Sequence, residues 1–292
     1  MKPAPFEYVA PNTIGMALDE LNQHGFGAKI LAGGQSLIPV MNFRLAQPEY
    51  LIDLNNIAEL DYLRPEGDVL RIGGMTRQRT LERSELIAQH APLIYEAVPY
   101  IAHPQIRNRG TIGGSIAHAD PAGELPVLAL ALGARLKLQS VAGERWVDAA
   151  DFFIELFETD LQENEILTEV EIPIAKPKTG YAFTEMARQH GNYALCGVAA
   201  WVTVDDDGVC QAAKLVYLNA GPVPMDAKDA AGLLIGEKGS DGVIAAAAEK
   251  ASQDEVEPNR DIHATAAYKR HLAKVLTKKV LKMAFERAGE NE

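Results

Sequence analysis

Ala32-Gly33-Gly34-Gln35-Ser36 and Thr111-Ile112-Gly113-Gly114-Ser115 are two similar glycine segments, and each leaves an apolar stretch of the chain. Paired glycines allow backbone N–H groups to converge on an anion, because no Cβ blocks the approach and positive φ angles are accessible. The Gln or Ser that follows adds a neutral hydrogen-bond donor. Two such segments facing one another would suit a pyrophosphate, with a dinucleotide extended between them.

We next compare these glycine segments with ordinary turns, and we search the chain for the sequence motifs of other kinds of site. A glycine pair after a strand is more often a turn, and Gly73-Gly74 is predicted to be one. The chain has no P-loop motif, and Gly25-Phe26-Gly27 precedes its strand and lacks the third glycine of a Rossmann site. It also has no Gly-x-Ser-x-Gly or His-Glu-x-x-His motif. His118 and Asp120 have no third ligand nearby, so no metal site is predicted.

Composition narrows the class of protein. The 292 residues contain 28 Lys+Arg and 40 Asp+Glu, a formal charge of −12, which is the wrong sign for a general nucleic-acid or anionic-membrane binder. Two cysteines, Cys196 and Cys210, can build neither a disulfide framework nor the four-ligand set of an iron–sulfur cluster, and they suit a reducing cytoplasm. The N-terminus lacks a signal-peptide pattern, and the apolar run 125–134 is too short to span a membrane.

Pattern along the chain predicts its organisation. Residues 1–57 are typical of a small α/β unit, and residues 58–175 form a larger mixed unit that ends where Pro173, Pro177 and Gly180 interrupt the chain. In residues 176–292, two strands at 194–204 and 209–218 flank Asp205-Asp206-Asp207-Gly208, a hairpin signal. A helix then closes the chain.

Two segments have an unbalanced charge. The stretch 148–171 contains nine acidic residues and no basic one, and residues 259–292 contain eight Lys+Arg against four Asp+Glu. We interpret both as solvated faces, with docking to an oppositely charged partner as the alternative.

The residues around the glycine segments match a known family. Residues 32–39, Ala-Gly-Gly-Gln-Ser-Leu-Ile-Pro, and 105–115, Gln-Ile-Arg-Asn-Arg-Gly-Thr-Ile-Gly-Gly-Ser, resemble the FAD-binding medium subunit of molybdenum hydroxylases, the carbon monoxide dehydrogenase and xanthine dehydrogenase relatives. Pro5-Phe6-Glu7-Tyr8, residues 50–54 and residues 188–195 extend the resemblance over nearly the whole chain. It implies an α+β fold: a two-part FAD-binding domain of the PCMH type (1–175, with subdomains of about 1–57 and 58–175), then a C-terminal α+β domain (176–292) with an antiparallel sheet and helices.

The resemblance also implies cofactor contacts. In the family the glycine segments bind the pyrophosphate and ribityl region of FAD through backbone amides, which carries over to Ala32, Gly33, Gly34, Gln35, Ser36, Leu37, Thr111, Ile112, Gly113, Gly114 and Ser115. Asp120 and Glu124 match acidic positions near the ribose and adenine end. Tyr193 falls in the segment that approaches the isoalloxazine ring, with core or hinge packing as its open alternative.

By the same resemblance the chain is an oxidoreductase subunit with no catalytic side chain or metal of its own, since a non-covalent FAD is the redox group. Its partners would be a small subunit with two [2Fe–2S] clusters and a large molybdenum–pterin subunit, assembled as a dimer of heterotrimers in the cytoplasm. Electrons would pass from the clusters to FAD and then to an external acceptor.

Two alternatives keep the fold. One is a self-sufficient flavin-dependent oxidase of the vanillyl-alcohol-oxidase type, for which the chain after Gly180 is short as a substrate domain. The other is a scaffold that has lost FAD, against which both glycine segments are intact.

Overall fold

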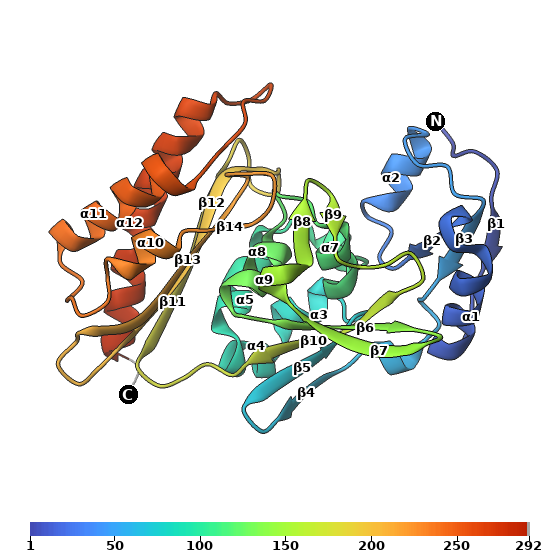
Figure 1. The fold of residues 1–292 in the computed structure, drawn as a ribbon, viewed down its shortest axis with the longest axis horizontal. Helices are drawn as coiled ribbons and strands as arrows, with labels where there is room; N and C mark the ends of the chain where they lie inside the picture. The colour runs from blue at the N-terminus through green and yellow to red at the C-terminus, as the bar shows by residue number, and fades with distance from the viewer. Residues whose placement is uncertain (291–292) are drawn as a thin grey trace.

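The computed structural model describes residues 1–290, and these form three parts that follow one another along the chain (Figure 1). The first part is a parallel three-stranded sheet in the order β1-β3-β2 with two helices. Thr13 caps the first helix by accepting from the Met16 N–H, and Gly25 ends it with φ 48°. The elements are β1 (Glu7–Val9), α1 (Ile14–His24), β2 (Ala28–Leu31), α2 (Leu37–Asn42) and β3 (Tyr50–Asp53).

The second part is an antiparallel five-stranded sheet, in the order β4-β5-β10-β6-β7, covered on one face by helices. Alternation places Leu70, Ile72, Leu136, Leu138 and Val170 in the core beneath those helices. The strands are β4 (Leu63–Glu66), β5 (Val69–Gly73), β6 (Arg135–Ser140), β7 (Gly143–Asp148) and β10 (Ile166–Pro173). The helices are α3 (Gln78–Arg83), α4 (Glu85–His90), α5 (Pro92–Ala97), α6 (Pro104–Arg107), α7 (Ile112–His118), α8 (Glu124–Ala131) and α9 (Ala149–Phe152), with a small hairpin of β8 (Phe153–Glu155) and β9 (Glu158–Thr159).

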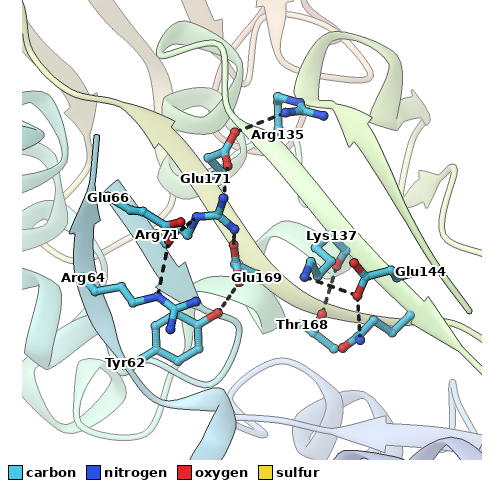
Figure 2. A network of polar contacts seen from close by, with 11 residues as sticks. Tyr62, Arg64, Glu66, Arg71, Arg135, Lys137, Glu144, Thr168, Glu169 and Glu171 are labelled. Carbon is cyan, nitrogen blue, oxygen red and sulfur yellow. Dashed lines mark hydrogen bonds and ion pairs between the residues drawn. The ribbon is translucent and has the colours of Figure 1, made fainter. Parts of the chain in front are cut away.

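The opposite face of this sheet has a network of ion pairs (Figure 2). Glu169 and Glu171 on β10 are buried, and both pair with Arg71 of β5, at 2.9 Å and 3.4 Å. Glu165 is likewise buried against Arg145, at 2.6 Å. The prediction of a solvated acidic face over 148–171 was therefore wrong for its last three acidic residues, because arginines from neighbouring strands compensate them inside the fold.

The third part is an antiparallel four-stranded sheet with helices on one face. The predicted hairpin is confirmed: Asp205 Oδ1 accepts from the N–H groups of Asp207 and Val209, and Gly208 has φ 76°. The strands are β11 (Thr179–Ala187), β12 (Ala194–Val204), β13 (Cys210–Leu218) and β14 (Met225–Asp226). The helices are α10 (Lys228–Gly232), α11 (Asp241–Lys250) and α12 (Ala266–Glu290), with a π-helical turn at Ala251–Glu255.

Helix α8 joins the second and third parts. All eight of its residues are buried, and its carboxyl end accepts a 2.7 Å hydrogen bond from Trp201 Nε1 of β12 to the Ala131 carbonyl. Phe183 and Val216 of the third part belong to the same core cluster as the helices of the second. A buried helix between two sheets accounts for the apolar run at 125–134, and no helix within residues 1–290 is long and apolar enough to cross a membrane.

Candidate functional site

The first glycine segment leaves β2 and turns into α2. Gly34 has φ 73°, a left-handed conformation that glycine adopts without strain, and Gln35 Nε2 donates to the Gly33 carbonyl at 2.9 Å. Across residues 1–290, no protein acceptor takes the backbone N–H of Gly33, Gly34, Gln35 or Ser36. Ser36 stands at the N-cap of α2, yet its hydroxyl makes no capping hydrogen bond. Four consecutive amides and a hydroxyl are thus free to bind an anion.

The second glycine segment differs from its prediction as a loop. Thr111 is the N-cap of α7, and its hydroxyl accepts from the Gly114 N–H at 3.1 Å. The N–H groups of Ile112 and Gly113 donate to the carbonyls of Thr76 and Gly74 at 3.0 and 2.9 Å. The amides of Ile112, Gly113 and Gly114 therefore already have protein acceptors, whereas the first segment has four consecutive amides without one.

Both glycine segments nevertheless meet, as their pairing predicted. A Cβ placed on Gly33 would lie 2.5 Å from the Arg109 carbonyl oxygen and 2.7 Å from Gly110 Cα, and one on Gly114 would lie 3.1 Å from Ala32 Cβ. The glycines of α7 thus permit close packing. Gly74 belongs to the same arrangement, since a Cβ on Gly113 would lie 2.6 Å from its carbonyl oxygen, so Gly73-Gly74 is more than a turn.

An arginine that sequence reasoning missed ties the two segments together. Arg77 Nη2 donates to Asn55 Oδ1 at 2.5 Å, Asn55 Nδ2 donates to the Ala32 carbonyl at 3.0 Å, and Arg77 Nη1 donates to the Arg109 carbonyl. Burial and the nearby Arg109 guanidinium lower the pKa of Arg77. A cavity of about 390 Å³ lies beside the tie, lined by residues 31–35 and by Ile106 and Arg109. No local signal marks Arg77, because its side-chain partners come from two other segments, at Asn55 and Arg109.

Asp120, Glu124 and Tyr193 gather at the other end of α7. Asp120 Oδ1 accepts from the Ala122 N–H at 2.9 Å and shapes the turn into α8, where Glu124 is only 9% exposed. Burial raises the pKa of Glu124 to about 7. Tyr193 precedes β12, and its residue as a whole is 69% exposed. Partial desolvation, together with the charges of Asp120 and Glu124, raises the pKa of its hydroxyl.

This grouping bears on the roles that the resemblance implies for Asp120, Glu124 and Tyr193. The resemblance placed Asp120 and Glu124 near the adenine end of FAD and Tyr193 near the isoalloxazine ring, which is the opposite end of the molecule. The structure brings all three residues to one end of α7, and their roles toward FAD stay predictions. The burial of Glu124 also leaves its carboxyl little room to contact a ribose directly.

A second buried carboxyl, absent from the sequence-based site, faces this group. Glu185 lies on β11, and one of its carboxyl oxygens is buried without a hydrogen-bond partner. Burial and the charge of Glu124 raise the pKa of Glu185 to about 8. His118 at the end of α7 has its pKa lowered by burial and lies 5.2 Å from the Phe157 ring. Within the described residues no cluster of three metal-ligating side chains occurs.

Glu185→Gln is expected to raise the free energy of unfolding by about 2 kcal/mol at about pH 9 and to change it little at about pH 5. The raised pKa means that the folded state holds the proton more tightly than the unfolded chain, so this stabilisation is present at low pH and is lost as pH rises toward 8. Urea unfolding at both pH values measures it. Glu163→Gln, at an exposed glutamate, is the matched control, and equal effects of the two variants would contradict the prediction.

Comparison with known proteins agrees with the fold and with the presence of an FAD-binding domain. Residues 4–175 match the family described as the FAD binding domain in molybdopterin dehydrogenase, and residues 181–284 match the CO dehydrogenase flavoprotein C-terminal domain. The chain therefore belongs to the FAD-binding medium subunits of the molybdenum hydroxylase family, whose members are oxidoreductases.

Individual relatives match over their whole length. The chain is 40% identical to the 6-hydroxypseudooxynicotine dehydrogenase complex subunit alpha of Paenarthrobacter nicotinovorans, covering 99% of this chain and 97% of that protein. It is 38% identical to the carbon monoxide dehydrogenase medium chain of Hydrogenophaga pseudoflava, covering 99% and 100%. Among solved structures, carbon monoxide dehydrogenase from the same organism matches with a TM-score of 0.95 at 39% identity (98% and 99% covered), and quinoline 2-oxidoreductase from Pseudomonas putida 86 with 0.95 at 36% (99% and 100% covered).

Proposed function

We propose that this chain holds FAD non-covalently and passes electrons from the [2Fe–2S] clusters of a small partner subunit to an external acceptor. The observation that carries the proposal is the row of four free backbone amides at Gly33–Ser36, beside the cavity at Arg109. Backbone amides and nearby guanidinium groups suit a pyrophosphate, because both donate hydrogen bonds to its negatively charged oxygens. FAD would supply the electron-accepting chemistry, so this chain needs no nucleophile or acid–base pair of its own.

Helix α7 orients the cofactor in this proposal. The free amides lie near its amino end, and Asp120 and Tyr193 lie beyond its carboxyl end. The helix has seven residues, so its two ends are about 10 Å apart. We place the pyrophosphate at the amides and the isoalloxazine ring toward Tyr193. In this placement Asp120 lies near the flavin-ring end of FAD and not near its adenine end. Glu124 is buried and influences this end through its charge.

The proposed assembly contains this chain, the small iron–sulfur subunit and a large molybdenum–pterin subunit, as a dimer of heterotrimers in the cytoplasm. Relatives named as subunits of dehydrogenase complexes support it, as do cysteines too few for a cluster. We also propose a domain boundary after residue 175, which the matched ranges 4–175 and 181–284 support.

The absorbance spectrum of the purified chain, before and after acid precipitation, tests the proposal. We expect flavin absorbance that moves to the supernatant, because the proposed binding is non-covalent and is lost when acid unfolds the chain. Flavin retained in the pellet would favour the self-sufficient oxidase. A colourless chain that also fails to take up added FAD would contradict the proposal and favour the scaffold.

A further inference from the structure

Asn219 connects three segments that are distant in sequence. It follows β13 with φ 51°, a left-handed conformation that asparagine tolerates better than most residues. Its backbone N–H donates to the Pro121 carbonyl at 2.7 Å, and its Nδ2 donates to the Ala194 carbonyl at 2.6 Å. Its Oδ1 accepts from Lys269 Nζ at 3.0 Å. Every hydrogen-bonding group on this side chain is thus directed at a different element.

Lys269 is the buried member of the otherwise largely exposed basic residues of α12. Its side chain is 3% exposed, and its ammonium pairs with Asp261 at 2.8 Å in addition to Asn219. The hydrogen bond from Lys269 holds the pKa of Asp261 at about 2, helped by the backbone N–H groups of His263 and Ala264. A buried ammonium is costly without such partners, so the position of Lys269 is set by Asp261 and in turn sets the orientation of the Asn219 amide.

The contacts of Asn219 converge on the flavin-ring end of the proposed site. Pro121 belongs to the turn that Asp120 shapes, and Ala194 directly follows Tyr193. We propose that Asn219, oriented by Lys269, is a positioning residue that fixes Tyr193 relative to the Asp120 turn and so shapes the surface that receives the isoalloxazine ring. This inference rests on the proposed function.

Asn219→Gly is the sharpest test, because glycine keeps the left-handed backbone and the N–H bond to Pro121 while deleting both side-chain contacts. We expect the Kd for FAD to rise about tenfold, the scale of one or two lost hydrogen bonds. The Kd for ADP should be unchanged, because ADP has the pyrophosphate but no flavin ring. Titration of the flavin-free full chain with FAD and with ADP, followed by calorimetry, measures both constants.

Lys269→Met should show the same selective loss, because the Asn219 amide then has no ammonium to orient it. Lys214→Met is the matched control. Lys214 also makes an ion pair in this part of the chain, with Asp226 at 2.6 Å, but it does not pair with Asn219 or Asp261. It should leave the ratio of the two constants unchanged.

Two outcomes of the titrations would overturn this inference alone: equal weakening of FAD and ADP in Asn219→Gly, as expected for a general structural role, or an unchanged Kd for FAD. A wild-type chain that binds no FAD would overturn the proposed function as well. The comparison of wild-type chain and variant therefore separates the two failures.

Discussion

Gly33→Ala should raise the Kd for FAD about a hundredfold while leaving most of the chain folded. The added Cβ would lie 2.5 Å from the Arg109 carbonyl oxygen, which belongs to backbone and cannot rotate away. The first glycine segment must then shift as a unit, and its four free amides move with it. Losing two hydrogen bonds to a charged pyrophosphate accounts for a change of this size. Calorimetric titration of the flavin-free chain with FAD measures it.

Gly15→Ala is the control for this substitution. Gly15 lies in α1 of the same part of the chain, and a Cβ there meets no atom within 4 Å. Alanine should stabilise that helix slightly and leave FAD affinity unchanged. Gly33→Ala should cost the fold about 1–3 kcal/mol through local overpacking, so titrations belong well below its unfolding temperature. FAD affinity equal to that of Gly15→Ala would show that the amides at Gly33–Ser36 do not hold the cofactor.

The glycine segments show which part of the site is predictable from sequence. Residue type reveals that Gly34 can adopt a positive φ, and the structure agrees. That the amides near it converge on an anion stays a prediction. Which amides stay free depends on other segments: the carbonyls of Gly74 and Thr76 occupy those of the second segment. Those carbonyls approach only when the segment after β5 packs against the start of α7, so no local pattern in residues 111–115 records their presence.

Buried charge was the other feature that sequence reasoning missed. An arginine or glutamate in a polar stretch is normally solvated, which is why residues 148–171 were interpreted as a surface. Arg71 and Arg145 compensate Glu169 and Glu165 only because strand register brings them together. By contrast, the strand 194–204 and the Asp-Gly turn after it depend on near neighbours in the chain, and those predictions were confirmed.

Arg107→Met should lower the free energy of unfolding by about 3–5 kcal/mol, the cost of breaking a buried ion pair from one side. Arg107 belongs to the motif that leads into the second glycine segment, yet it is 5% exposed and is not among the residues that line the cavity. Its guanidinium donates twice to Glu82, at 3.0 Å each, and once to the Ile101 carbonyl at 2.7 Å. Methionine fills similar space but leaves the Ile101 carbonyl without this donor and leaves Glu82 with Arg79 as its remaining partner. Urea unfolding at neutral pH measures the change.

Arg135→Met separates this effect from the general loss of an arginine. Arg135 is 51% exposed and pairs with Glu171 at 3.3 Å on the open face of the sheet, so its removal should cost at most about 1 kcal/mol. Adding Glu82→Gln to Arg107→Met should recover part of the lost stability, because the uncompensated charge is then gone; Arg79, which also pairs with Glu82, limits that recovery. The Arg107 hydrogen bond also holds the pKa of Glu82 below its usual value. The difference in unfolding free energy between wild type and Arg107→Met should therefore shrink as the pH falls through the lowered pKa of Glu82. Equal destabilisation by Arg107→Met and Arg135→Met would contradict a buried, stabilising role of the Arg107–Glu82 pair.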